Sequence, residues 1–355
     1  MSQRPLHIPS EWRETAEEIL AHGGPVMVIG PPGSGKDIFC LYLTGLFCKQ
    51  QRRVAWIDAD PEQPFIGPPA AFSLALYADP TELLRRKQPL SMGFIGNTSP
   101  VGRLLDAVSS LQKLYNRALS LRPDLVIINA CGHVNGGAAR ELAFHEIDML
   151  APRYVVALQQ THEVEHLLSP HGHRAGLLIR RIPLSPDADA PTSEARRAMR
   201  EQRFKEYFRG ADYQDIALHD VGVHGPGLGN GERLGFRDIN LLSKTLQGIV
   251  IHAELSADRL FLITDGGYTE DELFAARQQY RIREITVVKR SELDYLLVGL
   301  NDDQNQCLGL GIIRELDVKE MTLRMVTPVR DVTPVRHLSF GSLRVNPAGN
   351  ELGQW

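Results

Sequence analysis

The chain has 355 residues and a mass of 39.6 kDa, with 43% apolar and 23% charged residues. This composition excludes a wholly disordered or collagen-like polypeptide, and the length fits about two domains of ordinary size. The formal net charge is −4, which excludes a protein that binds nucleic acid by bulk positive charge. Any such binding here needs a local basic patch.

Nothing in the sequence indicates a membrane or secreted protein. No segment reaches the ~18 consecutive apolar residues of a membrane span, and acidic and polar residues stand where a secretory signal would place its apolar core. We therefore expect a cytoplasmic protein without a membrane partner. Its cysteines lack the paired spacing of a zinc site or a disulfide framework, which predicts buried thiols at Cys40, Cys48, Cys131 and Cys307.

Apolar runs and helical periodicity alternate through the first part of the chain. They predict a helix over 10–22, a strand over 26–29, a glycine-rich turn over 30–36 and a helix over 38–48. Further strands are expected at 54–57, 125–128, 154–158 and 176–182, with helices near 102–120, 137–150 and 163–168. This alternation is typical of an α/β fold with a mainly parallel sheet covered by helices on both faces.

The pattern changes after about residue 212. The chain becomes rich in glycine and turns, and short alternating strands are expected at 248–252, 259–263, 284–288, 295–299, 308–313, 322–326 and 338–345. One helix is expected at 269–280. We therefore predict a first domain over 1–212 and a smaller, mostly β C-terminal domain over 213–355. The segment 183–191, with its prolines and aspartates, is expected to be a mobile loop within the first domain.

The sharpest motif is GPPGSGKD at residues 30–37, which follows a predicted strand and opens a helix. In that context its backbone N–H groups can cradle a β-phosphate while Lys36 reaches the β and γ oxygens. The residue after such a lysine is usually Ser or Thr, whose hydroxyl binds Mg²⁺, but here it is Asp37. A carboxylate is a good Mg²⁺ ligand, whereas its charge near a triphosphate opposes nucleotide binding, so the sequence leaves both consequences open.

A second motif, DADPEQP at residues 58–64, follows the predicted strand 54–57. Residues at the carboxyl ends of parallel strands project into the ligand crevice, so Asp58 and Asp60 are expected beside the phosphate loop. A carboxylate there can accept the proton of an attacking hydroxyl or hold a metal ion. The alternative is a pair of solvated turn residues.

A third strand ends in LVIINACGHVNGG at residues 125–137. Many P-loop proteins have a metal-binding aspartate at this strand end, but this chain has Asn129, which moves the acidic role to Asp58 or Asp60. The glycines that follow allow the backbone to approach a ligand, and His133 is a candidate to stack on a base. A histidine in an ordinary turn is the alternative.

The segment 192–210 is rich in arginine. Arg196 and Arg200 are four residues apart and so share one helix face. Two guanidinium groups on one face can close over phosphates and neutralise the charge that develops during transfer. Taken alone, the segment also fits a solvated basic helix.

In this order the motifs resemble the polynucleotide 5′-hydroxyl-kinase family, P-loop enzymes that phosphorylate the 5′ end of RNA or DNA and include kinases of mRNA 3′-end formation and pre-rRNA processing. The resemblance runs through most of the chain, without a counterpart of the separate N-terminal domain of longer members. It implies an α/β fold of the P-loop NTPase type followed by a smaller β domain. It also implies ATP and Mg²⁺ as cofactors, and as partner an RNA and/or DNA with a 5′-hydroxyl end.

The resemblance assigns roles by position. Residues 58–64 resemble the family's aspartate and glutamine motif, which makes Asp60 and Gln63 the corresponding residues. GNTSP at 96–100 resembles the clasp that holds the nucleotide, and the segment 183–210 resembles the lid that carries the arginine pair. His133 stands where the family has an aromatic residue that stacks on the substrate. The departures from the family pattern are Asp37 for a hydroxyl residue, Glu62 for glycine and His133 for tryptophan.

The sequence therefore predicts an ATP-dependent polynucleotide 5′-hydroxyl kinase. The expected catalytic residues are Lys36, Asp60, Arg196 and Arg200, with Asp58 as the second candidate base. The expected metal ligands are Asp37 and Asp60, and the expected substrate contacts are His133 and Gln63. The expected nucleotide contacts are Gly30, Pro31, Pro32, Gly33, Ser34, Gly35, Lys36, Asp37, Gln63, Asn97 and Thr98.

Two alternatives stay open at this stage. The same phosphate loop and lid arginines would serve a kinase for a small acceptor such as a nucleoside or nucleotide. A non-enzymatic protein is the other alternative, in which Asp37 has disabled the metal site and the chain is a nucleotide-binding RNA scaffold.

Overall fold

The computed structural model describes residues 7–84, 87–185, 191–225 and 227–355, and the chain divides into two compact units, Met1–Phe204 and Lys205–Trp355. The domain boundary predicted at residue 212 lies at the start of strand β8 (Asp212–Ala217). Residues 186–190 of the expected mobile loop lie outside the described residues. Within the part of the chain that the structure describes, no helix has the length and apolarity needed to cross a membrane.

The first unit is built on a sheet with the strand order β4-β3-β2-β5-β1-β6-β7. All the strands predicted for this unit are present and run parallel: β1 (Val26–Ile29), β2 (Val54–Ala59), β5 (Leu125–Ala130), β6 (Tyr154–Leu158) and β7 (Leu178–Ile182). Two strands that the sequence reading missed, β3 (Ala71–Tyr77) and β4 (Ser91–Phe94), add an antiparallel extension. Short apolar runs of this kind do not distinguish a strand from a buried helix.

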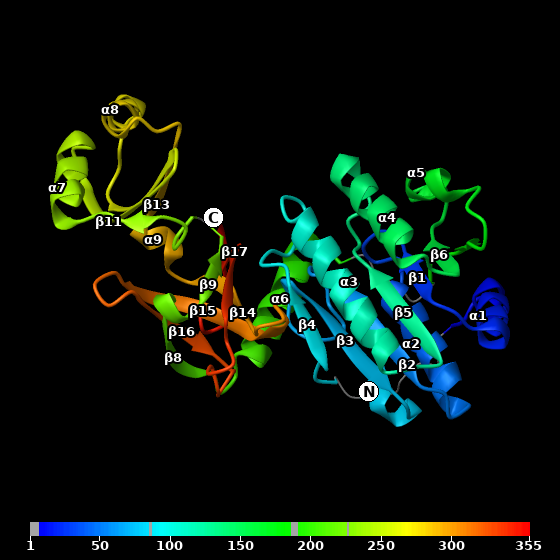
Figure 1. The fold of residues 1–355 in the computed structure, drawn as a ribbon. Coiled ribbons are helices and arrows are strands. Elements are labelled where there is room, and N and C mark those ends of the chain that lie inside the picture. The colour runs from blue at the N-terminus through cyan, green and yellow to red at the C-terminus, as the bar shows by residue number, and fades with distance from the viewer. Residues whose placement is uncertain (1–6, 85–86, 186–190, 226) are drawn as a thin grey trace. The chain divides into compact units, whose positions relative to one another are not determined.

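Helices cover both faces of this sheet, as predicted (Figure 1). Side chains alternate between the faces along each strand, so that in β5 Val126 and Ile128 pack on one side and Leu125 and Ile127 on the other. Burial on both faces explains why these strands read as continuous apolar runs. The helices of this unit are α1 (Ser10–His22), α2 (Lys36–Lys49), α3 (Leu104–Ser120), α4 (Gly136–Leu150), α5 (Glu165–Leu168) and most of α6 (Ser193–Tyr207).

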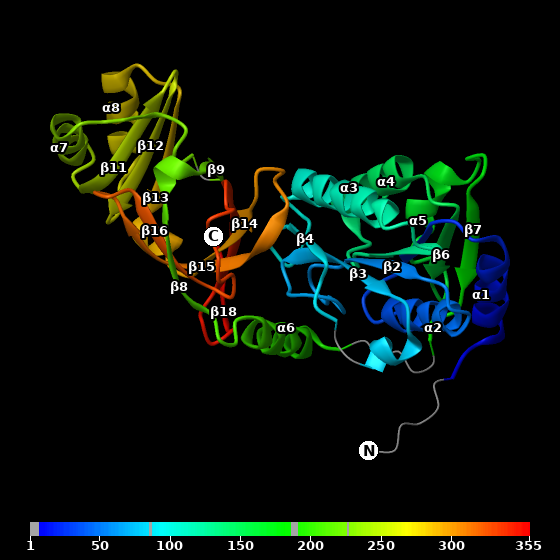
Figure 2. The same cartoon turned by 60° about the horizontal axis from the view of Figure 1, so that its bottom comes forward.

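The second unit contains a four-stranded sheet of order β10-β11-β12-β13 and a second group of strands, β18-β17-β14-β15-β16-β8, in which β9 pairs with β17 (Figure 2). The remaining strands are β9 (Gly222–His224), β10 (Glu232–Arg233), β11 (Ile249–Ser256), β12 (Arg259–Asp265), β13 (Glu284–Lys289), β14 (Leu296–Asn301), β15 (Cys307–Asp317), β16 (Thr322–Thr327), β17 (His337–Val345) and β18 (Glu351–Gln354). All the strands predicted for this part are present, and the region is mostly β.

The helix content of the second unit departs from the prediction of a single helix. The expected helix is α8 (Glu270–Tyr280), and it begins with a capping box formed by Thr269 and Glu272. In addition, α7 (Phe236–Thr245) packs on the four-stranded sheet through buried Leu242, and α9 (Arg290–Leu293) is a single turn. The sequence reading missed α7 because it follows a glycine-rich stretch and carries no N-cap side chain. All the cysteines are free and buried, as predicted.

Candidate active site

The glycine-rich turn between β1 and α2 forms a phosphate loop. Gly33 and Gly35 adopt φ angles of 74° and 91°, which only glycine enters without strain. Lys36 begins α2 and is only 6% exposed. Its Nζ donates to the backbone oxygens of Gly30 at 3.1 Å and of Pro31 at 3.3 Å. A cation and the N-terminus of a helix therefore meet at one loop, which is the arrangement that binds phosphate.

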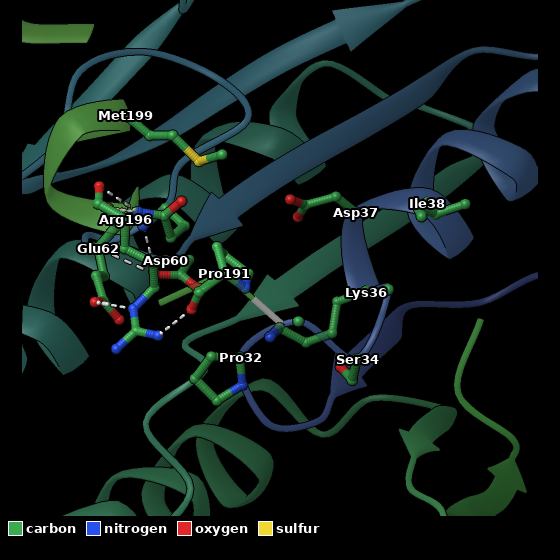
Figure 3. Close-up of a pocket in the computed structure, with 13 residues that line it drawn as sticks. Pro32, Ser34, Lys36, Asp37, Ile38, Asp60, Glu62, Pro191, Arg196 and Met199 are labelled. Atoms are coloured by element: carbon green, nitrogen blue, oxygen red, sulfur yellow. Dashed lines mark hydrogen bonds and ion pairs between the residues drawn. The ribbon is translucent and has the colours of Figure 1, made fainter. Parts of the chain in front are cut away.

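A pocket of about 280 Å³ lies against this loop (Figure 3). Its lining combines the phosphate loop with the residues that follow β2 and with residues of the lid. The described lining residues are Pro32, Gly33, Ser34, Gly35, Lys36, Asp37, Ile38, Asp60, Glu62, Gln63, Pro191, Arg196 and Met199. The structure therefore gathers three separately predicted motifs around one cavity.

Asp60 lies at the edge of this pocket and is held by backbone groups. Its Oδ1 accepts from the N–H groups of Glu62 at 3.0 Å and Gln63 at 3.1 Å, and its Oδ2 accepts from the N–H of Gly132 at 3.2 Å. The last bond joins the loop after β2 to the loop after β5. The carboxylate is 7% exposed, so it is fixed in orientation and still faces the cavity.

Asp58 has a different environment. It is fully buried, and its Oδ2 accepts from the N–H groups of Phe65 at 2.5 Å and Ile66 at 2.8 Å. Burial and the neighbouring Asp37 carboxylate raise its pKa well above the usual range. Asp58 does not line the pocket, so the geometry disfavours its prediction as a second base and indicates that it anchors the loop after β2.

Asp37 and Asp58 are connected through Asn129, whose Nδ2 donates to Asp37 Oδ1 at 2.6 Å and to Asp58 Oδ1 at 3.2 Å. The other amide atom, Oδ1, is buried without a hydrogen-bond partner. Burial raises the pKa of Asp37, although Lys36 acts in the opposite direction. The asparagine at the end of β5 thus bridges the two carboxylates through one amide nitrogen.

The arginines of α6 contact the loop after β2. Arg196 Nε lies 2.9 Å from Glu62 Oε1, and Arg196 Nη1 donates to the backbone oxygen of Pro191 at 2.9 Å (Figure 3). Arg200 Nη1 lies 3.3 Å from the same Glu62 oxygen. Gln63 Nε2 donates to the backbone oxygen of Arg196 at 3.1 Å. The lid and this loop therefore form one network.

Several predicted residues lie outside the described lining of the pocket. Asn97 is buried, with its Oδ1 accepting from the N–H of Ser99 at 3.2 Å, and Thr98 is half-buried. His133 is exposed on the loop that begins at Gly132. Its backbone N–H donates to Cys131 Sγ. Among the described residues, no aromatic ring stacks on its imidazole. The clasp and stacking roles therefore stay predictions.

The donor set fits a magnesium ion bound together with a nucleotide. Within the described ranges, no group of three or more His, Cys, Asp or Glu residues is placed to hold a metal alone. Asp37 and Asp60 nevertheless line the same pocket as Lys36. Mg²⁺ usually takes one or two carboxylates and completes its shell with phosphate oxygens and waters, so the chemistry of this lining is compatible with such an ion.

Sequence reasoning missed three contributions to this site. Glu62 was noticed only as a departure, and its pairing with two arginines needs the fold. Pro191 and Met199 line the pocket and lie in the predicted lid segment, but neither was singled out as a site residue. Arg203 Nη1 donates to the backbone oxygen of Phe65 at 3.2 Å. The sequence could have predicted this contribution, because the spacing of seven residues from Arg196 places Arg203 on the same helix face.

Comparisons with known proteins identify the family of this chain. Residues 30–210 match the family model described as mRNA cleavage and polyadenylation factor CLP1 P-loop. The chain is 30% identical to a polyribonucleotide 5′-hydroxyl-kinase of Pyrococcus abyssi over 95% of this chain and 92% of that protein. It is 26% identical to one of Methanocaldococcus jannaschii over 92% of this chain and 89% of that protein.

A solved structure shares the fold. The structure of a wild-type Clp1p–Pcf11p complex matches with a TM-score of 0.62 at 18% identity, over 96% of this chain and 80% of the matched chain. The family model covers just over half of the chain, and the relatives cover nearly all of it. This chain therefore belongs to the CLP1 P-loop family, which is the family that the motifs resemble.

Proposed function

We propose that this protein is an ATP-dependent kinase that transfers the γ-phosphoryl group of ATP to the 5′-hydroxyl end of a polynucleotide, with RNA as the principal acceptor. The observation that carries the proposal is that Lys36 and Asp60 line one pocket. A phosphate-binding cation and a fixed carboxylate beside it are what in-line transfer to a hydroxyl requires. The names of the relatives, polyribonucleotide 5′-hydroxyl-kinases, support the choice of acceptor.

The residues of the phosphate loop bind the triphosphate. Its backbone N–H groups and the start of α2 face the β-phosphate, and Lys36 exchanges its contacts with Gly30 and Pro31 for phosphate oxygens. Asp37 and Asp60 would hold Mg²⁺, which would supply additional positive charge for the γ-phosphate. Arg196 lines the same pocket and neutralises charge that develops in the transition state.

Asp60 accepts the proton of the 5′-hydroxyl in this proposal. Three backbone N–H groups fix the orientation of its carboxylate, so that little reorganisation is needed when the hydroxyl arrives. Since Gly132 is one of these donors, the loop that carries His133 is tied to the base. This proximity supports His133 as the platform on which the terminal nucleotide stacks.

Comparison of acceptors tests the proposal against a small-acceptor kinase. The expected result is labelling of 5′-hydroxyl RNA and DNA oligonucleotides, with the higher kcat/KM for RNA. The KM for the oligonucleotide should rise with salt concentration, because added salt weakens the binding of its phosphates to basic side chains. A nucleoside or nucleotide acceptor would show little salt dependence. Faster labelling of monomers than of oligonucleotides would contradict the proposal, and binding of ATP without any transfer would favour the scaffold.

A further inference from the structure

One carboxylate oxygen of Glu62 contacts both lid arginines. Glu62 Oε1 lies 2.9 Å from Arg196 Nε and 3.3 Å from Arg200 Nη1. Figure 3 shows the Arg196 guanidinium between this carboxylate and the backbone oxygen of Pro191. Guanidinium groups bind phosphate oxygens with the same charge-assisted geometry that they use for carboxylates. Glu62 therefore occupies the position of an anion between two cations.

This ion pair lies at the triphosphate pocket. Glu62 lines the cavity together with Lys36 and Arg196. Its own N–H donates to Asp60 Oδ1, so the carboxylate belongs to the loop that carries the proposed base. Gln63 adds two backbone contacts, because its Nε2 donates to the oxygens of Glu62 and Arg196. Helix α6 is thus tied to the loop after β2 at the edge of the pocket.

The ion pair between Glu62 and Arg200 is shielded from solvent, which makes its interaction stronger than that of an ordinary surface ion pair. The Arg200 side chain is 11% exposed and that of Glu62 is 29% exposed, which reduces screening by solvent. A second pair on the same helix has a more exposed arginine: Arg197 Nε lies 3.1 Å from Glu201 Oε1, and the arginine side chain is 54% exposed while that of Glu201 is 26% exposed. Glu62 and Arg196 line the pocket, whereas Arg197 and Glu201 are not among its described lining residues.

We propose that Glu62 is a positioning residue that acts as an internal stand-in for a terminal phosphate. It holds Arg196 and Arg200 at the pocket and releases them when phosphate oxygens, which carry more charge, arrive. Glu62 therefore competes with the ligand for the arginines. The proposal rests on the proposed function in one respect, since it takes this pocket as the nucleotide site.

The competition predicts that removal of the carboxylate charge tightens triphosphate binding. Glu62→Gln keeps the shape of the side chain, and we expect its Kd for ATP in calorimetry to be roughly fivefold lower than that of the wild type. The Kd for AMP, which has no terminal phosphate to meet the lid, should stay the same. Glu201→Gln is the control and should change neither value. Glu62→Ala provides a second variant with the same expectation if the glutamine variant does not fold.

The outcomes separate this proposal from the proposed function. An unchanged or weaker affinity of both Glu62 variants for ATP would contradict the proposed competition. It would show that Glu62 only stabilises the position of α6. Equal tightening for ATP and AMP overturns it as well. Lys36→Ala tests the assumption beneath it, because a variant that binds ATP as well as the wild type would show that the pocket is not the nucleotide site. These are binding measurements, so they do not depend on detectable phosphoryl transfer.

Discussion

Asn129 donates a hydrogen bond of 2.6 Å from its Nδ2 to Oδ1 of Asp37. The bond joins the end of β5 to the first turn of α2, and the same amide also reaches Asp58 at 3.2 Å. The Asp37 carboxylate is half-buried and that of Asp58 is fully buried, and neighbouring carboxylates repel when both are ionised. A neutral amide between them reduces this repulsion, which allows a carboxylate at position 37 in this chain.

Replacement of that amide by a third carboxylate should destabilise the protein. Asn129→Asp removes the donor to Asp37 and Asp58 and adds a like charge in a fully buried position. We expect a loss of about 2 to 4 kcal/mol in the free energy of unfolding at neutral pH, and a smaller loss in acid, where the carboxylates are protonated. Denaturant unfolding at two pH values measures this. Asn116→Asp on the exposed face of α3 is the control, and equal losses in both variants would contradict the account.

Asp37 should set the magnesium requirement. In Asp37→Asn the ligand charge is lost while the shape remains, so the Mg²⁺ concentration for half-maximal phosphoryl transfer should rise about tenfold. Asp37→Ser restores the hydroxyl that usually follows the lysine and should recover most of this loss. A titration of turnover against Mg²⁺ measures both. If Asp37→Asn needs less magnesium than the wild type, the carboxylate opposes nucleotide binding instead.

Replacement of Asp58, near the end of β2, and of Asp60, just after it, should have different effects. Asp60→Asn should lower kcat by about 10²- to 10⁴-fold, because a general base is lost, with a small change in stability. Asp58→Asn should mainly destabilise, by about 2 kcal/mol, because its NH₂ group would face donors in either orientation, namely the N–H groups of Phe65 and Ile66 or Nδ2 of Asn129. Turnover and thermal unfolding of both variants give the comparison. A lower kcat in a stable Asp58→Asn protein would contradict this account and support Asp58 as a catalytic base.

Sequence reasoning predicted the parts of this protein whose signals are local. Apolar runs that are buried on both faces marked the parallel strands β1, β2, β5 and β6, and the spacing of Lys36 after its glycines located the phosphate loop. It failed where tertiary contact decides the outcome. The different roles of Asp58 and Asp60 depend on which carboxylate accepts from the N–H groups of residues 65 and 66. The pairing of Glu62 with Arg196 joins residues that are far apart in the chain.

Stability should also depend on pH through Glu146. This residue of α4 is 2% exposed, one carboxyl oxygen lacks a hydrogen-bond partner, and burial raises its pKa from 4.5 to about 8. The native state therefore holds this proton more tightly than the unfolded state does. Its contribution favours folding below pH 4.5 and is lost as the pH rises through about 8, at a cost of up to about 5 kcal/mol.

A charge-neutral replacement should remove this dependence. Glu146→Gln is expected to match the wild type near pH 5 and to exceed it in free energy of unfolding at pH 8 to 9. Urea unfolding across this range measures the difference. Glu141→Gln, an exposed position of the same helix, should leave the wild-type profile unchanged. Parallel profiles for Glu146→Gln and the wild type would show that Glu146 is not the group responsible.

The most direct test of the account is transfer of labelled γ-phosphate from ATP and Mg²⁺ to a 5′-hydroxyl RNA oligonucleotide. Lys36→Ala and Lys49→Ala, at opposite ends of α2, form the matched pair of variants. The account predicts label at the 5′ end with the wild type and Lys49→Ala, and loss of label with a folded Lys36→Ala. Absence of label with a folded, ATP-binding wild-type protein, or full transfer by Lys36→Ala, would contradict it.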